Sequence, residues 1–214
     1  MTLNADIQAR LAGAKAQMPP PVFAKLGAMF ERLEGAHVGT GAPKVGEPAP
    51  DTRLTVEGGS EVRLASLHED GLLVLIFYRG RWCPFCDLTL RAFDAEAEAF
   101  KVAGARLVGV SPQTTEESAK TADERSLNFE VLSDPHNAAA QAFGLAWALT
   151  EEERQLYIAF DSKLDVANGD DRWQLPAPAT FIIDQAGVVR WAWVDSNWTR
   201  RPEPTDVLAA LRAL

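Results

Sequence analysis

The hydrophobic positions near the N-terminus recur at helical spacing, and those near the middle of the chain form unbroken runs. Residues 3–36 follow the helical pattern in two pieces that are separated by the segment Met18-Pro19-Pro20-Pro21, which predicts two helices. The apolar positions of the second helix share one face: Phe23, Leu26, Phe30 and Leu33. We therefore expect this face to be buried against another surface.

From residue 72 onward, apolar runs alternate with helical segments. The run LLVLIFY at 72–78 contains no strongly polar position until its final tyrosine, which is typical of a strand covered on both faces. Further strands are predicted at 106–111 and 129–134, and the helices between and after them at 84–103, 114–127 and 136–144. This alternation predicts a parallel sheet with crossover helices.

The flanking segments complete an α/β architecture. The pattern predicts a Gly- and Pro-rich linker at 37–50, a hairpin around Gly58-Gly59, a helical insertion at about 145–175, a second hairpin from 180–184 and 188–194, and a last helix at 204–213. We therefore expect an N-terminal helical extension and linker over residues 1–43, followed by one domain over residues 44–214.

Composition and charge exclude several functional classes. Hydrophobic residues make up 47% of the chain, which is enough for a core, and the net charge of −9 disfavours binding to a nucleic-acid backbone. No apolar run approaches the ~20 residues of a membrane span. The N-terminus carries Asp6, Arg10 and Lys15 and does not resemble a signal peptide, so the expected compartment is the cytoplasm, where structural disulfides are rare.

Both cysteines of the chain lie where the strand at 72–78 gives way to a helix, in the sequence RWCPFC. Pro84 suits the first helical position, which makes Cys83 the N-cap residue and places Cys86 in the first turn. Free backbone N–H groups and the helix dipole stabilise a thiolate there, and Arg79 and Arg81 are close enough in sequence to contribute. A lowered thiol pKa is what redox chemistry requires.

The two sulfurs are expected to differ. Cys86 starts an apolar stripe along its helix that continues through Leu90, Phe93, Ala97 and Phe100. We therefore expect Cys86 to point inward and Cys83 to lie at an exposed mouth. An exposed thiol of low pKa attacks and a buried partner resolves, so this argument makes Cys83 the nucleophile.

Three other interpretations of the cysteine pair are weaker. A structural disulfide across a four-residue loop would contribute only ~2 kcal/mol. Zinc needs four ligands, and His37, His68 and His136 are scattered singly. Two inert packing cysteines would not require this spacing after a strand, whereas CxxC within a strand–helix–strand pattern favours a redox pair. We expect no metal and no cofactor, and the sequence contains no glycine-rich phosphate loop.

Several motifs resemble those of known families. Trp82-Cys83-Pro84-Phe85-Cys86 resembles the WCxxC active site of thioredoxins, and the segment PATFIID at 178–184 resembles the one that begins with the cis-proline of that superfamily. Over about 44–214 the chain is similar to the peroxiredoxin branch (alkyl hydroperoxide reductase and thiol-specific antioxidant proteins), specifically to the group with a CxxC motif. VGEPAPDTRL, VGVSP, VLSD and FGL follow that family's order.

The resemblance implies a thioredoxin fold of the peroxiredoxin-like type, with a central mixed β-sheet flanked by helices and an N-terminal helical extension. It also implies substrate-binding positions at Trp82, Pro84, Ala177 and Pro178, with Pro178 as the cis-proline. Aligned on Cys86, the chain departs from the peroxiredoxin pattern at each supporting position. Arg79 stands in place of the family's proline, Cys83 in place of its threonine, and Pro178 in place of its distant arginine.

The two families assign the reacting cysteine differently. The thioredoxin pattern makes Cys83 the nucleophile, whereas the peroxiredoxin pattern makes Cys86 the peroxide-reactive residue. Our main interpretation is a thiol–disulfide oxidoreductase in redox homeostasis that cycles through a Cys83–Cys86 disulfide and is restored by an external thioredoxin or glutathione system. The alternatives are an antioxidant thiol-dependent peroxidase for hydrogen or organic peroxides, with Cys86 or Cys83 as the peroxidatic residue, and a non-catalytic redox sensor or interaction protein.

A homodimer is favoured, because a second subunit could cover the apolar face of the N-terminal extension.

Overall fold

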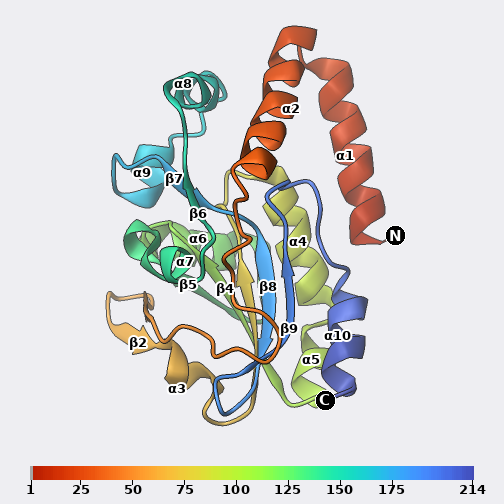
Figure 1. Cartoon of the computed structure of the whole chain (residues 1–214), viewed down its shortest axis with the longest axis vertical. Coiled ribbons are helices and arrows are strands. Elements are labelled where there is room, and N and C mark those ends of the chain that lie inside the picture. The colour runs from red at the N-terminus through yellow and green to blue at the C-terminus, as the bar shows by residue number, and fades with distance from the viewer. Residues whose placement is uncertain (1) are drawn as a thin grey trace.

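The computed structural model describes residues 2–214 and shows a mixed β-sheet at the centre of the molecule with helices on both faces (Figure 1). The sheet has seven strands in the order β2-β1-β5-β4-β3-β8-β9. These strands are β1 (Arg53–Thr55), β2 (Glu61–Arg63), β3 (Leu72–Phe77), β4 (Ala105–Ser111), β5 (Glu130–Ser133), β8 (Ala179–Ile183) and β9 (Val189–Val194). β3, β4 and β5 are parallel to one another, β8 pairs antiparallel with β3, and β9 pairs antiparallel with β8, which confirms the predicted α/β fold with a mixed sheet.

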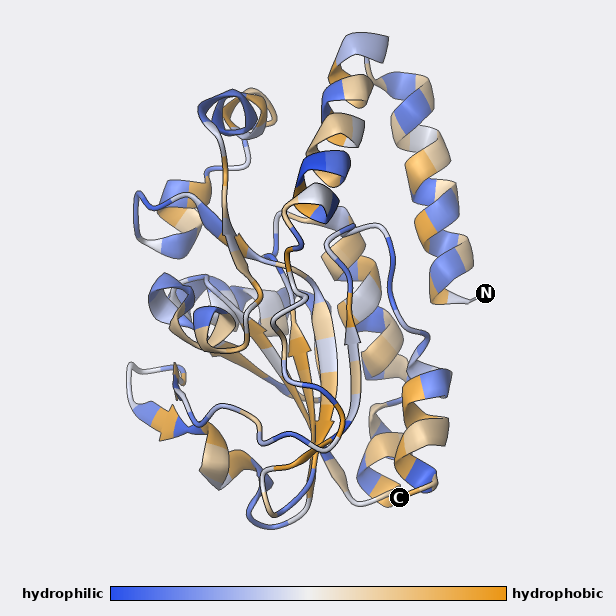
Figure 2. Ribbon diagram, in the orientation of Figure 1, coloured by the Kyte–Doolittle hydropathy of each residue, from blue (hydrophilic) through white to orange (hydrophobic). Residues whose placement is uncertain are grey.

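The unbroken apolar run of β3 fills two separate cores, one on each face of the sheet. Val74 and Ile76 pack with the helices α4 (Pro84–Ala95), α5 (Ala97–Val102) and α10 (Pro204–Arg212). Leu73, Leu75 and Phe77 point to the opposite face, where they pack with α3 (Leu64–His68) and α7 (Ala138–Ala142). Alternate side chains of a strand point to opposite faces, so a strand covered on both faces carries apolar side chains at nearly every position. Figure 2 shows the central strands as mostly hydrophobic.

The crossover helices follow the predicted order. α4 and α5 connect β3 to β4, α6 (Thr115–Arg125) connects β4 to β5, and the 3₁₀ turn η1 (Pro135–Asn137) leads from β5 into α7. Thr114 is the N-cap residue of α6, and its side chain accepts a hydrogen bond from the Glu117 N–H. None of the helices among the described residues is long and apolar enough to span a bilayer.

The segment predicted as a helical insertion contains strands as well. It consists of β6 (Ala146–Ala148), α8 (Glu151–Ala159), α9 (Leu164–Asn168) and β7 (Gln174–Pro176). β6 and β7 pair antiparallel as a separate two-stranded sheet. Each of these strands is only three residues long, which is too short to produce a recognisable alternation of polar and apolar positions. A capping box between Thr150 and Glu153 fixes the start of α8.

The N-terminal extension is a helical hairpin formed by α1 (Leu3–Gln17) and α2 (Pro20–Gly35), which rises above α4 in Figure 1. α1 packs along α4, and its first turn is held by Glu203, the residue before α10. The Glu203 carboxylate accepts hydrogen bonds from the backbone N–H groups of Leu3 (3.0 Å) and Asn4 (2.8 Å) and from the Asn4 side chain (2.7 Å). These bonds satisfy amide groups that a helix N-terminus otherwise leaves without partners.

The apolar side of α2 is covered in part by the same chain. Met29 and Leu33 are buried and pack in one cluster with Trp147, Tyr157 and Trp198, which come from the insertion and from the loop before α10. Of the predicted face, Leu33 is covered within the chain, whereas Phe23, Leu26 and Phe30 stay partly exposed, and the homodimer stays a prediction.

Gly144, at the end of α7, provides a test of how the linker is attached to the domain. Its φ of +67° favours glycine, and a Cβ there would lie 2.8 Å from the backbone carbonyl of Gly41. We expect Gly144→Ala to lower the free energy of unfolding by roughly 2–4 kcal/mol, because left-handed strain adds to a backbone clash. Gly59, with a φ of +87° and open space around it, is the matched control. Gly59→Ala should cost only about 1–2 kcal/mol in urea unfolding, and equal losses for both variants would contradict the clash.

Candidate active site

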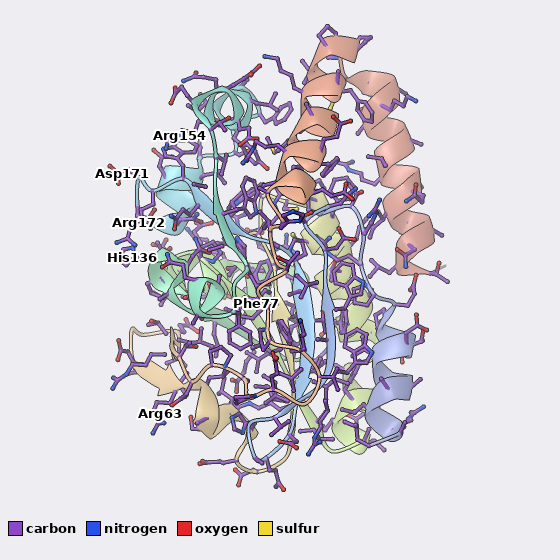
Figure 3. The ribbon with its side chains drawn as sticks, in the orientation of Figure 1. Arg63, Phe77, His136, Arg154, Asp171 and Arg172 are labelled. Carbon is purple, nitrogen blue, oxygen red and sulfur yellow. The ribbon has the colours of Figure 1, made fainter. Side chains whose placement is uncertain are left out.

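The two cysteines lie where the central strand of the sheet meets its first crossover helix. Phe77, labelled near the centre of the molecule in Figure 3, is the last residue of β3. α4 then begins at Pro84, with Cys83 as its N-cap residue in an extended conformation and Cys86 in its first turn. The local sequence therefore builds the predicted strand-to-helix junction.

The structure corrects the predicted exposure of Cys83. Both cysteines are only 1% exposed, and they share a buried cluster with Tyr78 and Leu90. Cys86 points inward as expected, but Cys83 does not lie at an exposed mouth. The prediction was wrong because it considered α4 alone, whereas residues outside the helix also cover its N-terminus, among them the half-buried Trp82.

The environment of the two thiols shifts their pKa values in opposite directions. Burial acts to raise the pKa of Cys86, but a hydrogen bond from the Cys83 thiol, the guanidinium groups of Arg201 and Arg79, and the Arg79 N–H outweigh it and lower this pKa to about 5. Burial raises the pKa of Cys83 well above its ordinary value, and its hydrogen bond to Cys86 adds to the effect. Cys86 is therefore the thiolate near neutral pH and Cys83 is the thiol, which reverses the assignment favoured by the sequence.

Arg201 is a site residue that the sequence analysis missed. Its Nη2 lies 3.7 Å from the Cys86 Sγ, while its Nη1 donates to the carbonyl oxygens of Trp198 and Arg200, both at 2.6 Å. It lies in the loop between β9 and α10, whereas the family alignment placed the distant arginine at Pro178. The sequence offers only the pair Arg200-Arg201 shortly before the last helix as a hint.

Arg79 approaches Cys86 through its backbone N–H, and the charge of its guanidinium lowers the Cys86 pKa. Its N–H lies 3.5 Å from the Cys86 Sγ, and its guanidinium donates to the hydroxyl of Tyr157. Aromatic rings surround the guanidinium carbon at 4.8 Å (Trp82), 5.7 Å (Tyr157) and 4.2 Å (Trp198), a favourable arrangement for a buried cation. Burial raises the pKa of Tyr157 to about 12, so this hydroxyl keeps its proton.

Arg81 does not take the predicted role of stabilising the thiolate. Its guanidinium binds the carboxylates of Glu117, at 2.8 Å, and Glu124, at 3.1 Å, both on α6. The cation is therefore neutralised by acidic side chains at the surface, and Arg201 occupies the position near Cys86 that was expected for it.

Trp82 is positioned by the glycine two residues before it. Gly80 has a φ of +141°, and a Cβ on it would lie 2.5 Å from the indole nitrogen of Trp82. The indole can therefore fold back over the chain only because residue 80 has no side chain. In this position Trp82 meets the ring of Tyr157 edge-on, at 5.4 Å, and covers Arg79.

The three remaining predicted substrate-binding residues do not form one surface. Pro84 is exposed at the start of α4, whereas Ala177 and Pro178 are buried. No peptide bond among the described residues is cis, so the expectation for Pro178 was wrong. The Ala177 N–H donates to the carbonyl oxygen of Leu145 (2.9 Å) in the inserted segment, which occupies a backbone group that we expected to bind substrate.

Among residues 2–214, no group of three or more histidine, cysteine, aspartate or glutamate side chains is arranged to hold a metal ion.

Comparisons with known proteins agree with this fold. The family model described as "AhpC/TSA family" matches residues 45–192. Peroxiredoxin Bcp of Bacillus subtilis is 27% identical over 150 residues, which are 70% of this chain and 84% of that protein.

Two solved structures show the same architecture. Peroxidoxin BcpB from Mycobacterium tuberculosis has a TM-score of 0.63 and 26% identity, covering 80% of this chain and 98% of that one. Peroxiredoxin Q of Xanthomonas campestris has a TM-score of 0.58 and 23% identity, covering 76% of this chain and 90% of that one. The resemblance expected from the sequence is confirmed: the chain belongs to the AhpC/TSA family and is a thioredoxin-fold oxidoreductase of the peroxiredoxin-like branch.

Proposed function

We propose that the chain is a thiol-dependent peroxidase in which Cys86 reacts with hydrogen or organic peroxide and Cys83 resolves the product. The observation that carries this proposal is the Cys86 thiolate between Arg201 and Arg79. Relatives named peroxiredoxins support the same reaction class. The alternative from the sequence is thus favoured over the disulfide reductase, because attack by Cys83 would require deprotonating the thiol of raised pKa.

The peroxide step follows from the charges at the site. The Cys86 sulfur attacks one peroxide oxygen, the O–O bond breaks, and the departing oxygen takes the bonding electrons. Arg201 and Arg79 are fixed where this negative charge moves, so they stabilise the transition state without reorganisation. The Cys83 thiol, which is hydrogen-bonded to Cys86, is positioned to protonate the departing oxygen, giving water or an alcohol.

Resolution uses the same pair of residues. Loss of its proton leaves Cys83 as a thiolate, which attacks the sulfur of the Cys86 sulfenic acid and forms the Cys83–Cys86 disulfide. The departing hydroxide takes up a proton and leaves as water. An external thiol, of the kind supplied by thioredoxin or glutathione systems in a reducing compartment such as the cytoplasm, then restores the dithiol. Cys83 thus combines the hydrogen-bonding role of the family's threonine with that of a resolving cysteine.

Cysteine variants separate these roles. Cys86→Ser should abolish the reaction with hydrogen peroxide, because it removes the thiolate. Cys83→Ser should react nearly as fast as the wild type, since a hydroxyl can donate the same hydrogen bond, but it should stop at a sulfenic acid that dimedone traps. Cys83→Ala removes the donor and should raise the Cys86 pKa by about one unit. Stopped-flow kinetics and mass spectrometry measure these outcomes.

The same cysteine experiment tests the disulfide-reductase alternative. If Cys86→Ser still reacts with peroxide and Cys83→Ser does not, the proposed order of the sulfurs is wrong. If the wild type reduces a protein disulfide rapidly but leaves peroxide unreacted, the main interpretation from the sequence is correct.

The arginines predict a change in pH dependence. The thiolate is the reactive form, so the wild-type peroxide rate should be constant above about pH 6 and fall as the pH drops through the Cys86 pKa of about 5. Arg201→Met should move this midpoint upward by about 1–2 units, because a hydrogen bond to a charged group contributes roughly 1.5–3 kcal/mol. Arg81→Met is the matched control, and its midpoint should stay near that of the wild type. Thiolate absorbance at 240 nm provides the titration, and equal shifts for both variants would contradict the role of Arg201.

A further inference from the structure

The charges around Cys86 do not balance. The side chains of Arg79 and Arg201 are buried, with 2% and 6% of each residue exposed. Within residues 2–214, neither guanidinium lies within ion-pair distance of a carboxylate, and their polar partners are a tyrosine hydroxyl, backbone carbonyls and the Cys86 sulfur. The reduced site therefore contains two cations and one anion, the Cys86 thiolate.

The acidic residues nearest in sequence to this site are committed elsewhere. Asp87 follows Cys86 directly, but its carboxylate binds the guanidinium groups of Arg91 and Arg125. Glu203 follows Arg201 by two residues, but its carboxylate holds the first turn of α1. Glu153 lies one helical turn from Tyr157, but it binds the guanidinium of Arg32 at 2.7 Å. The net charge of the chain is −9, but these carboxylates are not counterions of Arg79 or Arg201.

Formation of the disulfide removes the one anion. A Cys83–Cys86 disulfide is neutral, so two buried guanidinium groups would then share the site without a negative charge. A buried charge without a partner is strongly unfavourable. The oxidised site must therefore acquire an anion or open to water.

Two buried donors indicate where an anion would bind. The Nε of Arg79 and the indole Nε1 of Trp82 are both buried and have no hydrogen-bond partner. They belong to side chains in contact, since the Arg79 guanidinium lies over the Trp82 ring. A carboxylate would supply a negative charge for the Arg79 guanidinium and oxygen atoms that accept hydrogen bonds from these two donors.

Access to this position leads past Trp82. Beside it lies a surface hollow of about 230 Å³ that is lined by Arg81, Trp82, Glu117, Asp161, Ser162 and Lys163. The half-buried indole of Trp82 thus lines this hollow and also lies against the guanidinium of Arg79.

We propose that the oxidised enzyme binds a carboxylate at Arg79 and Arg201, and that its reductant is a thiol carrying such a group. This inference rests on the proposed function, since it concerns the disulfide formed there. The reductant's thiolate attacks the Cys83 sulfur, the S–S bond breaks, and its electrons pass to Cys86, the better leaving group because two guanidinium groups stabilise it. A second thiolate then attacks the reductant's sulfur in the mixed disulfide, which releases the oxidised reductant and Cys83, and Cys83 takes up a proton.

A series of small thiols tests the preference for negative charge. Oxidised protein is reduced with 3-mercaptopropionate, 2-mercaptoethanol or cysteamine, and alkylation followed by mass spectrometry gives rate constants per thiolate. We expect the anionic thiol to react about tenfold faster than the cationic one, and Arg79→Met to reduce this ratio at least threefold. The net charge of −9 favours the opposite order, so it cannot produce this result. Equal rates, or a faster cationic thiol, would overturn the proposal.

Two cysteine variants test anion binding without any reductant and without changing an arginine. Cys86→Ser removes the thiolate and therefore has the charges of the oxidised site, whereas Cys83→Ser loses a sulfur but keeps the anion. Iodide is the probe, because the fluorescent side chains of Trp82 and Trp198 enclose Arg79. Iodide should quench Cys86→Ser and the oxidised wild type about threefold more than Cys83→Ser, while neutral acrylamide quenches all three equally.

The quenchers also separate this proposal from simple opening of the site. If acrylamide quenching rises together with iodide quenching, the oxidised site admits water instead of binding an anion, and the proposal is wrong. Failure of the peroxidase itself is distinguishable, because it appears as the absence of sulfenic acid in Cys83→Ser and does not affect iodide binding to Cys86→Ser.

Discussion

The electrostatic contact of one buried thiolate with two buried guanidinium groups is the interaction on which the site depends. Cys86 supplies the negative charge, and Arg79 and Arg201 approach it from two different segments. Each arginine is fixed by structure outside the central sheet. Tyr157 of the insertion and Trp198 of the last loop enclose Arg79, and the carbonyl oxygens of that same loop hold Arg201. The insertion and the C-terminal loop are therefore parts of the candidate active site.

The chain reaches a family-like arrangement through different residues. The position of the family's proline is occupied by Arg79, which adds a cation, and the position of its threonine by Cys83, which adds a second sulfur. The distant arginine is present in space but comes from the loop before α10, where the alignment of the strands did not place it. A guanidinium group thus lies beside the Cys86 sulfur, but it comes from a different position in the sequence.

Local patterns predicted the features that depend on neighbouring residues. The apolar run of β3, the N-cap at Cys83 and the inward direction of Cys86 all follow from spacing within one strand or one helix. The burial of Cys83 and the contact with Arg201 depend on segments far away in the chain, with 115 residues separating Arg201 from Cys86. Periodicity carries no information about such contacts. The strands β6 and β7 were missed for another reason, since three residues cannot display a period.

The hydrogen bonds from α1 to Glu203 connect the N-terminal hairpin to the chemistry of the sulfur. Glu203 lies two residues after Arg201, so one short stretch of backbone carries both the anchor of α1 and the cation of the active site. Any free energy by which the thiolate favours one placement of this stretch must also appear in the docking of α1, because coupling between two sites is reciprocal. A change in the placement of this stretch on oxidation of Cys86 would therefore alter the docking of α1. In that case, binding of a partner to α1 would change the free energy of oxidation of Cys86, and oxidation would change the affinity of the partner.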